Sequence, residues 1–491
     1  MPCPVQALAA QEQPKNKWLV MTTVAVGVFL STLDGSIVNV ALPTLARELH
    51  ASFAAVQWVV LSYLMTLVAL MMTAGRLADV RGKRLLYAAG FAIFTLGSLS
   101  CALAPHVVWL VAARVLQAVG ASLLMALGAA IVTEAFPPKE RGRSMGLVGL
   151  MVSLGLVSGP TLGGLILGNF SWQAIFFVNV PLGVLGTLLA LRVIPIRALP
   201  ARQPFDVRGG LLLVVTLLSF LLAVTLGPRT SWMSMPIVGL AVVAALGLCL
   251  FVRTELSNPH PLVDLRMFAS AHLAVNVTSG AIVFVASSGL VLLLPFFLQD
   301  VQGRSPEEAG LLLVTAPLMM GLSAPLSGWL SDRVGTRPLA ALGLLFLIFA
   351  YTLISGLELN TSGASYVARV AWLGLGMGIF QSPNNSAIMG AVPRDRLGVA
   401  SGLLSLTRTL GQTTGVALVG ALWAALVLAF DPSPSRDAMH APAGFQLLAL
   451  KWTARAVSVL LLAALILVVA DWRRERHRMG AAVAPDSSAA A

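Results

Sequence analysis

The chain has 491 residues, of which 57% are hydrophobic and only 11% are charged, which excludes an ordinary soluble protein. Many apolar runs exceed the roughly 20 residues that a helix needs to cross a bilayer, and the absence of period-two strands excludes an outer-membrane barrel. The net charge of +12 lies in short segments between apolar runs and indicates no nucleic-acid partner. We therefore predict an all-α polytopic membrane protein.

Fourteen membrane-spanning helices are expected, with both chain termini in the cytoplasm. Of the 32 Lys and Arg residues, 23 lie in segments that this topology places inside and four in segments that it places outside. This is the positive-inside asymmetry, which sets orientation and helix parity. The expected spans are about 18–42, 54–75, 84–104, 107–133, 144–167, 173–192, 209–227, 235–253, 271–298, 308–330, 338–357, 365–391, 398–429 and 445–470.

The first span carries one charged residue, Asp34, because Trp18 to Pro43 contains no other acid or base. A carboxylate in hydrocarbon costs at least a few kcal/mol, so it is normally protonated, paired or next to a water-filled cavity. The alternative is an Asp near a helix end that reaches out to water. Eight residues, about 12 Å of helix, separate Asp34 from Leu42, which disfavours that alternative. Asp34 is therefore predicted to be a protonatable, working group.

The fourth span carries Arg114 about seven residues from its outer end, roughly 10 Å of helix rise. This is close to the depth estimated for Asp34, so a direct or water-mediated coupling of the two is expected. A purely structural ion pair is the alternative. Gln117, three residues further along, is a candidate for the wall of a central cavity.

An internal repeat is visible in three pairs of segments. The residues 75–79 (GRLAD) recur as 328–332 (GWLSD) at an offset of 253, and Arg114 recurs as Arg369 at an offset of 255. Glu140–Gly142 recurs as Asp395–Gly398. Spans 1–6 and 9–14 are thus predicted to be homologous halves, with spans 7–8 as an inserted, peripheral pair. The predicted parts are a tail (1–17), an N-terminal half (18–192), a linker (193–208), the inserted pair (209–253), a C-terminal half (271–470) and a second tail (471–491).

Five segments together carry a family resemblance that covers nearly the whole chain. They are LDGSIVNVALP (33–43), GRLADVRGKR (75–84), LVAARVLQAVGAS (110–122), GLVSGPTLGG (155–164) and WQAIFFVNVP (172–181). The chain resembles the major facilitator superfamily, and within it the fourteen-span drug:proton antiporter branch, the EmrB/QacA-like exporters. The resemblance implies two six-helix halves around a central cavity, a monomeric working unit, and a part in proton coupling for Arg114.

The resemblance also assigns roles to two loops and to the fifth span. The loop after span 2 and its repeat mate are expected to gate the halves through charge pairs. The candidate gating residues are Gly75, Asp79, Arg81, Arg84, Gly328, Asp332 and Arg333. The fifth span has the pattern typical of antiporters: Pro160 frees a backbone carbonyl and bends the helix, and glycines form a small-residue face for tight packing. These glycines are Gly155, Gly159, Gly163 and Gly164.

The chain departs from some members of the branch, which carry extra acids in spans 10 or 13 that are linked to dicationic substrates. Here span 13 carries Arg408 instead, which favours monocationic, zwitterionic or neutral cargo. Pro383 beside two asparagines predicts a broken segment in span 12. Polar side chains that could line a cavity, or equally could bond helix to helix, are Asn39, Gln117, Asn276, Gln381, Asn384 and Asn385.

The leading hypothesis is a proton-coupled antiporter that exports lipophilic, monocationic or neutral drugs by alternating access, with Asp34 exchanging proton and substrate. The alternative is a proton-driven exporter dedicated to one endogenous metabolite, such as an antibiotic, siderophore or amino acid. An ATP-driven pump is disfavoured because no GxxxxGK[ST] phosphate loop occurs. An enzyme is disfavoured because the six His are scattered without an HExxH pattern.

We expect no cofactor and no metal site, with the proton gradient as the energy source. The expected partners are a small-molecule substrate, protons and the lipid bilayer, and a periplasmic adaptor protein is left open. The expected location is the bacterial cytoplasmic (inner) membrane, which the chain crosses many times.

Overall fold

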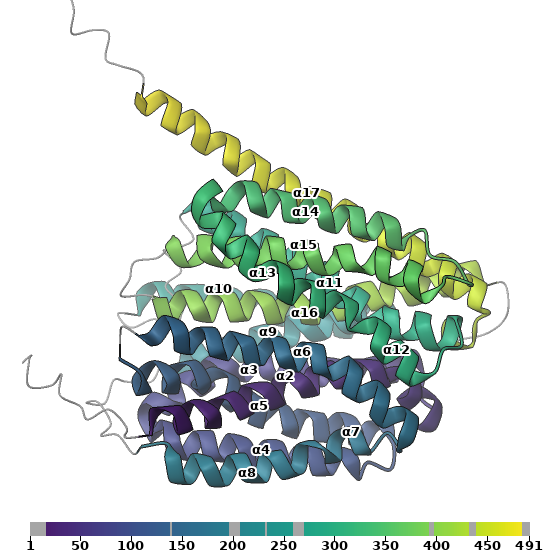
Figure 1. Cartoon of the computed structure of the whole chain (residues 1–491), viewed down its shortest axis with the longest axis horizontal. Helices are drawn as coiled ribbons and strands as arrows, with labels where there is room; N and C mark the ends of the chain where they lie inside the picture. The colour runs from purple at the N-terminus through teal and green to yellow at the C-terminus, as the bar shows by residue number, and fades with distance from the viewer. Residues whose placement is uncertain are drawn as a thin grey trace, which may run out of the picture. The chain divides into compact units, whose positions relative to one another are not determined.

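The computed structural model describes residues 16–137, 140–195, 207–230, 233–258, 270–391, 397–431 and 438–483. In this part of the chain every regular element is a helix (Figure 1). Thirteen helical segments of the described residues are long and apolar enough to cross a membrane by length and composition. The prediction of an all-α, polytopic membrane protein is confirmed.

The fourteenth expected span is present as a helix but is too polar for that test. Helix α15 (Gly363–Gly390) has 28 residues, so its length is sufficient. Its sequence contains Gln381, Asn384 and Asn385 together with many glycines, and these residues lower its mean hydropathy. A helix of this composition needs packed neighbours rather than lipid around it, and α15 packs along α13 and α14.

The contacts divide the chain into two compact units. Unit 1 consists of Met1–Ala51 and Trp58–Gly210. It contains most of α3 and the whole of six further helices. The helices of unit 1 are α2 (Lys17–Glu48), α3 (Phe53–Arg81), α4 (Lys83–Ala102), α5 (Val107–Ala135), α6 (Arg141–Asn169), α7 (Ala174–Phe177) and α8 (Asn179–Val193).

Unit 2 consists of Ser52–Gln57 and Leu211–Ala491. At its C-terminal end α17 extends beyond the other helices of the unit (Figure 1). The elements of unit 2 are α9 (Val207–Thr230), α10 (Met235–Ser257), α11 (Ala271–Phe296), a π-helical turn (Phe297–Val301), α12 (Pro306–Leu313), α13 (Thr315–Val334), α14 (Thr336–Ile354), α15, α16 (Leu397–Phe430), a 3-10 turn (Ala438–His440) and α17 (Ala443–Val483). The separation of 209–253 from the C-terminal half stays a prediction.

The core of unit 1 depends on close contact between α4 and α5. A Cβ atom on Gly120 would lie 2.3 Å from the backbone N of Phe94, and one on Gly97 would lie 2.5 Å from the Cα of Gln117. Small residues let membrane helices approach at backbone distance. The two glycines therefore bring the backbone of α5 at Gln117 directly against α4.

A proline in the interior of each unit is accommodated by a serine on a neighbouring helix. Pro160 in α6 frees the carbonyl of Leu156, four residues earlier, and Ser36 Oγ donates to that oxygen at 3.1 Å. Pro383 in α15 frees the carbonyl of Ile379, and Ser327 Oγ donates to it at 2.9 Å. Both helices stay continuous, because the freed carbonyl has a new donor.

The expected break in span 12 is therefore wrong, since α15 runs through Pro383 as one helix. Interruptions occur instead in spans 6 and 10. Helices α7 and α8 meet at Val178, and α12 and α13 meet at Val314. The ends of spans 2 and 14 extend past the predicted limits to Arg81 and Val483, because their polar ends continue the helix beyond the apolar run.

Candidate functional site

Asp34 lies near the middle of α2, 17 residues after its first residue and 14 before its last. These separations correspond to about 25 Å and 21 Å of helix rise. The side chain is completely buried. An Asp at the end of a span that reaches out to water is thus excluded by its position and burial.

Three side chains from α5 and α8 donate to this carboxylate, and a fourth side chain, from α4, bonds to one of them. Arg114 Nη1 donates to Asp34 Oδ2 at 2.5 Å. Gln117 Nε2 and Asn179 Nδ2 donate to Asp34 Oδ1 at 2.8 and 3.0 Å. Gln117 is held in place by Arg114 Nη1, which donates to its Oε1 at 2.6 Å, and by Ser98 Oγ, which accepts from its Nε2 at 2.7 Å. We call Asp34, Arg114, Gln117, Asn179 and Ser98 the Asp34 network.

Arg114 also binds to α3, which orients its guanidinium group. Its Nε donates to the carbonyl of Val59 at 3.1 Å, and its Cζ lies 4.1 Å from the centre of the Tyr63 ring. The Tyr63 hydroxyl donates to the carbonyl of Ser31 on α2 at 3.3 Å. The arginine is thereby fixed by contacts on three sides, which makes its ion pair with Asp34 geometrically well defined.

The donors around Asp34 match the ionised form of the carboxyl group. Asp34 accepts three hydrogen bonds from side chains, and a carboxylate is an acceptor only. Within the described residues Asn179 Oδ1 is buried and has no hydrogen-bond partner. A protonated carboxyl group needs an acceptor for its own hydrogen. Asn179 Oδ1 is an unused acceptor among the described residues, on a side chain that already bonds to Asp34.

The glycines of α6 bring that helix against the same part of α2. A Cβ on Gly155 would lie 2.1 Å from Thr32 Oγ1, and one on Gly159 would lie 2.4 Å from Ser36 Oγ. A Cβ on Gly163 would lie 2.9 Å from Ile37 Cγ1. Gly164 is buried in the same helix. These contacts lie before and after Asp34 along α2, on the face of that helix that carries Thr32 and Ser36.

The other cavity candidates do not join the Asp34 network. Asn39 donates to the carbonyl of Gly35 in its own helix at 3.0 Å. Asn276 belongs to unit 2 and donates to the carbonyl of His272 at 2.7 Å. Gln381 and Asn385 are half-buried on α15. Asn384 is buried, and its Oδ1 has no hydrogen-bond partner in the described part of the chain.

The side chains of Gly75, Asp79, Arg81 and Asp332 lie outside the described residues, so the gating expectation for them stays a prediction. Among the others, Arg84 donates to the carbonyl of Leu191. Gly328 lies against Ser382, whose Oγ would be 2.8 Å from an added Cβ. Arg333 is exposed and stacks on Trp329 at 3.8 Å.

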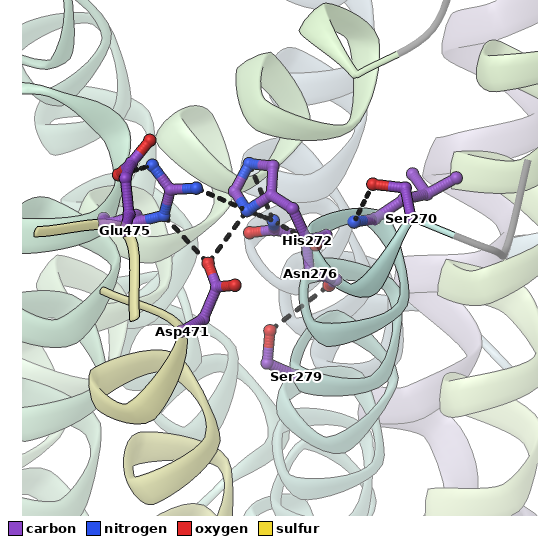
Figure 2. Close-up of polar contacts among 8 residues, drawn as sticks. Ser270, His272, Asn276, Ser279, Asp471 and Glu475 are labelled. Carbon is purple, nitrogen blue, oxygen red and sulfur yellow. Dashed lines mark hydrogen bonds and ion pairs between the residues drawn. The ribbon is translucent and has the colours of Figure 1, made fainter. Parts of the chain in front are cut away.

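A second polar cluster lies in unit 2 at the start of α11 and α14 and near the end of α17 (Figure 2). Asp471 Oδ2 accepts from Arg337 Nε at 2.8 Å and contacts His272 Nδ1 at 2.9 Å. Arg337 also donates to Glu475 and contacts His272 Nδ1 at 3.0 Å. Asn276 contacts the His272 ring at 3.2 Å. These half-buried groups join three helices, and the sequence reasoning did not single out His272, Asp471 or Glu475.

The sequence reasoning also missed Asn179, Ser98 and Tyr63. The signal for Asn179 was present in the segment 172–181, because an asparagine inside an apolar span needs a polar partner. Ser98 and Tyr63 had no distinguishing pattern. No group of three or more His, Cys, Asp or Glu residues that could hold a metal occurs among the described residues.

Comparison of the sequence with known proteins identifies one family model and several relatives that match most of the chain. Residues 24–416 match the model of the Major Facilitator Superfamily. The chain is 34% identical over 411 residues to the riboflavin transporter RibZ of Clostridioides difficile, covering 84% of this chain and 89% of that protein. It is 35% identical over 419 residues to the multidrug resistance protein Stp of Mycobacterium tuberculosis, covering 84% and 76%.

Among solved structures, the fold is similar to a bacterial homolog of the human lysosomal transporter Spinster, in an inward-facing and unoccupied conformation. The TM-score is 0.66 at 18% sequence identity, and the match covers 92% of this chain and 96% of that chain. At this identity the likeness concerns the fold alone.

Proposed function

Because the chain belongs to the major facilitator superfamily and is therefore a transporter of small molecules and not an enzyme, we propose a specific activity within that family. The protein is a proton-coupled antiporter of the fourteen-span drug:proton branch. It exports lipophilic, monocationic or neutral molecules by alternating access. Its place is the bacterial cytoplasmic membrane, with both termini in the cytoplasm and a monomer as the working unit.

The buried ion pair of Asp34 and Arg114 is the observation that supports this proposal most strongly. Asp34 is completely buried and lies at mid-helix, where an ionisable residue normally marks a proton or substrate pathway. Its charge is balanced by Arg114 at 2.5 Å. An acid in this setting changes its affinity for a proton whenever its distance from the arginine changes, which is what a proton-coupled cycle requires.

The vacant acceptor on Asn179 suggests how the network holds the proton. In the ionised state, Asn179 donates to Asp34 through Nδ2. When Asp34 is protonated, a half-turn of the Asn179 amide about its last side-chain bond presents Oδ1, which can accept the new O–H. Asn179 can thus serve both protonation states with one side chain. Protonation removes the negative charge that holds Arg114, so the arginine is released from Asp34.

The exchange of cargo for the proton follows from the same charge balance. A monocationic substrate near Asp34 replaces the proton as the partner of the carboxylate, and the two compete for one site. The names of several relatives agree with export of drugs: the multidrug resistance protein Stp is one, and the Streptomyces glaucescens tetracenomycin C resistance and export protein, 31% identical over 411 residues, is another.

The experiment is uptake of ethidium by inverted membrane vesicles, with a proton gradient imposed and then collapsed. Wild type takes up the dye only while the gradient is present. Asp34→Asn keeps the shape of the side chain, but it replaces one acceptor oxygen by an NH2 group and cannot hold a negative charge. Its gradient-driven uptake therefore falls to the level of vesicles without the protein. Glu358→Gln, at an exposed acid, is the matched control and retains uptake. Normal uptake by Asp34→Asn would disprove the proposal.

A second candidate function is transport dedicated to one metabolite. The similarity to the riboflavin transporter RibZ, which covers 89% of that protein, favours it. A transport screen over chemically diverse drugs and metabolites separates the two: one strong hit among many inactive compounds supports the dedicated transporter, and many hits support the multidrug exporter.

A further inference from the structure

Arg408 on α16 is a cation in the interior of unit 2, and none of the described residues is its counterion. The side chain is half-buried, its Nε atom is shielded from solvent, and no described residue is the hydrogen-bond partner of this atom. Among the described residues no carboxylate forms an ion pair with it. This arrangement is rare, because a charged group in a membrane span normally pairs with another charge or with backbone carbonyls.

Arg408 lies too deep to be explained by its reaching the membrane surface. Its neighbour Thr407 packs beside Gly280, since a Cβ on Gly280 would lie 3.9 Å from Thr407 Cγ2. Gly280 comes nine residues after Ala271, the first residue of α11, which is about 14 Å of helix rise. An arginine near a span end extends its head group to the interface, but this distance exceeds the length of the side chain.

A second unmatched polar group lies at the same place. Asn384 on α15 is 3% exposed, and its Oδ1 has no hydrogen-bond partner in the described part of the chain. Its Nδ2 lies 3.0 Å from the position of a Cβ on Gly280. Asn384 and Thr407 therefore both border Gly280, where α11, α15 and α16 meet. Arg408, the residue after Thr407 on α16, therefore lies at the same level of unit 2 as Asn384 on α15.

The other arginines within spans have protein partners among the described residues. Arg114 pairs with Asp34. Arg369 donates to the loop carbonyl of Gly356, and Arg455 stacks on the Trp452 ring at 4.9 Å. Each has a protein partner, so each is explained by the fold. Arg408 is explained by none of these contacts, and its half-buried state leaves part of it accessible to a mobile ligand.

We propose that Arg408 binds an anionic oxygen of the transported molecule, and that Asn384 Oδ1 accepts a hydrogen bond from an N–H or O–H group of the same molecule. The neutral cargo is thus a zwitterion, which carries an anionic group together with a cation. This inference rests on the proposed transport of small molecules and narrows the neutral class of cargo to molecules with an anionic group. It does not depend on proton coupling through Asp34.

The test uses rhodamine B, a zwitterion with a free carboxylate, and its ethyl ester, a monocation of the same shape. Binding of each dye to the purified protein in phosphatidylcholine nanodiscs is measured by fluorescence anisotropy, without a proton gradient. Wild type binds rhodamine B at least about tenfold more tightly than the ester, because a hydrogen bond to a charged group contributes more than an order of magnitude in affinity.

Arg408→Gln removes the preference, because it weakens the binding of rhodamine B about tenfold or more and leaves the binding of the ester unchanged. Arg408→Lys retains part of the preference. Arg369→Gln, at the arginine that donates to Gly356, is the matched control and keeps the wild-type ratio. Equal binding of the two dyes by wild type, tighter binding of the ester, or no binding of rhodamine B would overturn the proposal. An unchanged ratio in folded Arg408→Gln would overturn it as well.

The two proposals fail in different measurements. If wild type binds rhodamine B no more tightly than its ester, the role of Arg408 is contradicted, whatever drives transport. Gradient-independent uptake in vesicles contradicts the role of Asp34 and leaves the dye preference untouched. If Arg408→Gln does not fold, the ratio in wild type and in Arg408→Lys still decides the first question.

Discussion

The two units treat buried charge in opposite ways. In unit 1, Asp34 and Arg114 are both buried, and their charges cancel at 2.5 Å. In unit 2, Arg408 has no acid among the described residues, and the repeat mate of Arg114, Arg369, binds a loop carbonyl instead. At the repeat offset of 253, Asp34 corresponds to Ser287, which donates to the carbonyl of Val283 in its own helix.

This difference suggests a division of roles between two halves of common layout. The ionised pair of unit 1 has no net charge, and protonation of Asp34 leaves the positive charge of Arg114 without its partner. An unbalanced cation is stabilised only when a ligand supplies the missing charge. A serine that bonds to the carbonyl freed by a proline occurs in both units, at Pro160 and at Pro383, although the repeat does not pair these two positions.

The largest expected effect on stability comes from removing Arg114 in unit 1, and removing Arg408 in unit 2 is the comparison. Arg114→Met leaves Asp34 buried without its counterion and destabilises the protein by about 3–5 kcal/mol. Arg408→Met removes a cation that forms no ion pair with the described residues, so it is neutral or stabilising. The measurement is the thermal unfolding midpoint in detergent.

The double variant Asp34→Asn with Arg114→Met controls for lost packing. It recovers a large part of the stability, because no charge is left unpaired. A double variant that is no more stable than Arg114→Met would contradict the charge explanation, and a large loss in Arg408→Met would show that Arg408 has a structural partner.

A smaller effect is expected where α6 contacts α2 beside Asp34. Gly159→Ala places a Cβ 2.4 Å from Ser36 Oγ and destabilises the protein by about 1–3 kcal/mol through overpacking. Gly149→Ala in the same helix meets nothing within 4 Å, so it is neutral or up to about 1 kcal/mol stabilising. Both are measured by thermal unfolding, and equal effects at the two positions would show that the close approach is unimportant.

Asn179→Ala tests the vacant acceptor in the Asp34 network. It removes the donor at 3.0 Å from Asp34 and the unused Oδ1, so gradient-driven ethidium uptake falls roughly tenfold, as expected for one hydrogen bond to a charged group. Asn169→Ala removes an exposed asparagine that bonds within its own helix and serves as the control. Full uptake by Asn179→Ala would restrict this residue to a packing role.

The smallest effect is expected in the half-buried cluster of unit 2. Asp471→Asn weakens the contacts to Arg337 and His272 but lowers stability by only about 1 kcal/mol or less, because ion pairs open to water contribute little. The same loss is produced in wild type by raising the salt concentration to screen the pair. Thermal unfolding in low and high salt measures both, and a loss as large as that of Arg114→Met would contradict the contrast between the two clusters.

Sequence alone determined the membrane class and predicted fourteen spans and a working role for Asp34 and Arg114. These features depend on composition and on the spacing of charges, and a charge inside a long apolar run is visible without coordinates. The repeat and the family motifs likewise indicated the family, because they are properties of short contiguous segments.

Only the tertiary structure decided which groups meet. Asn179 and Ser98 join the Asp34 network from α8 and α4, and Tyr63 on α3 packs on Arg114. No local pattern encodes such contacts between helices distant in sequence. The continuity of α15 through Pro383 depends on Ser327 of another helix. The isolation of Arg408 is of the same kind, since a charge is paired or unpaired according to what the fold brings beside it.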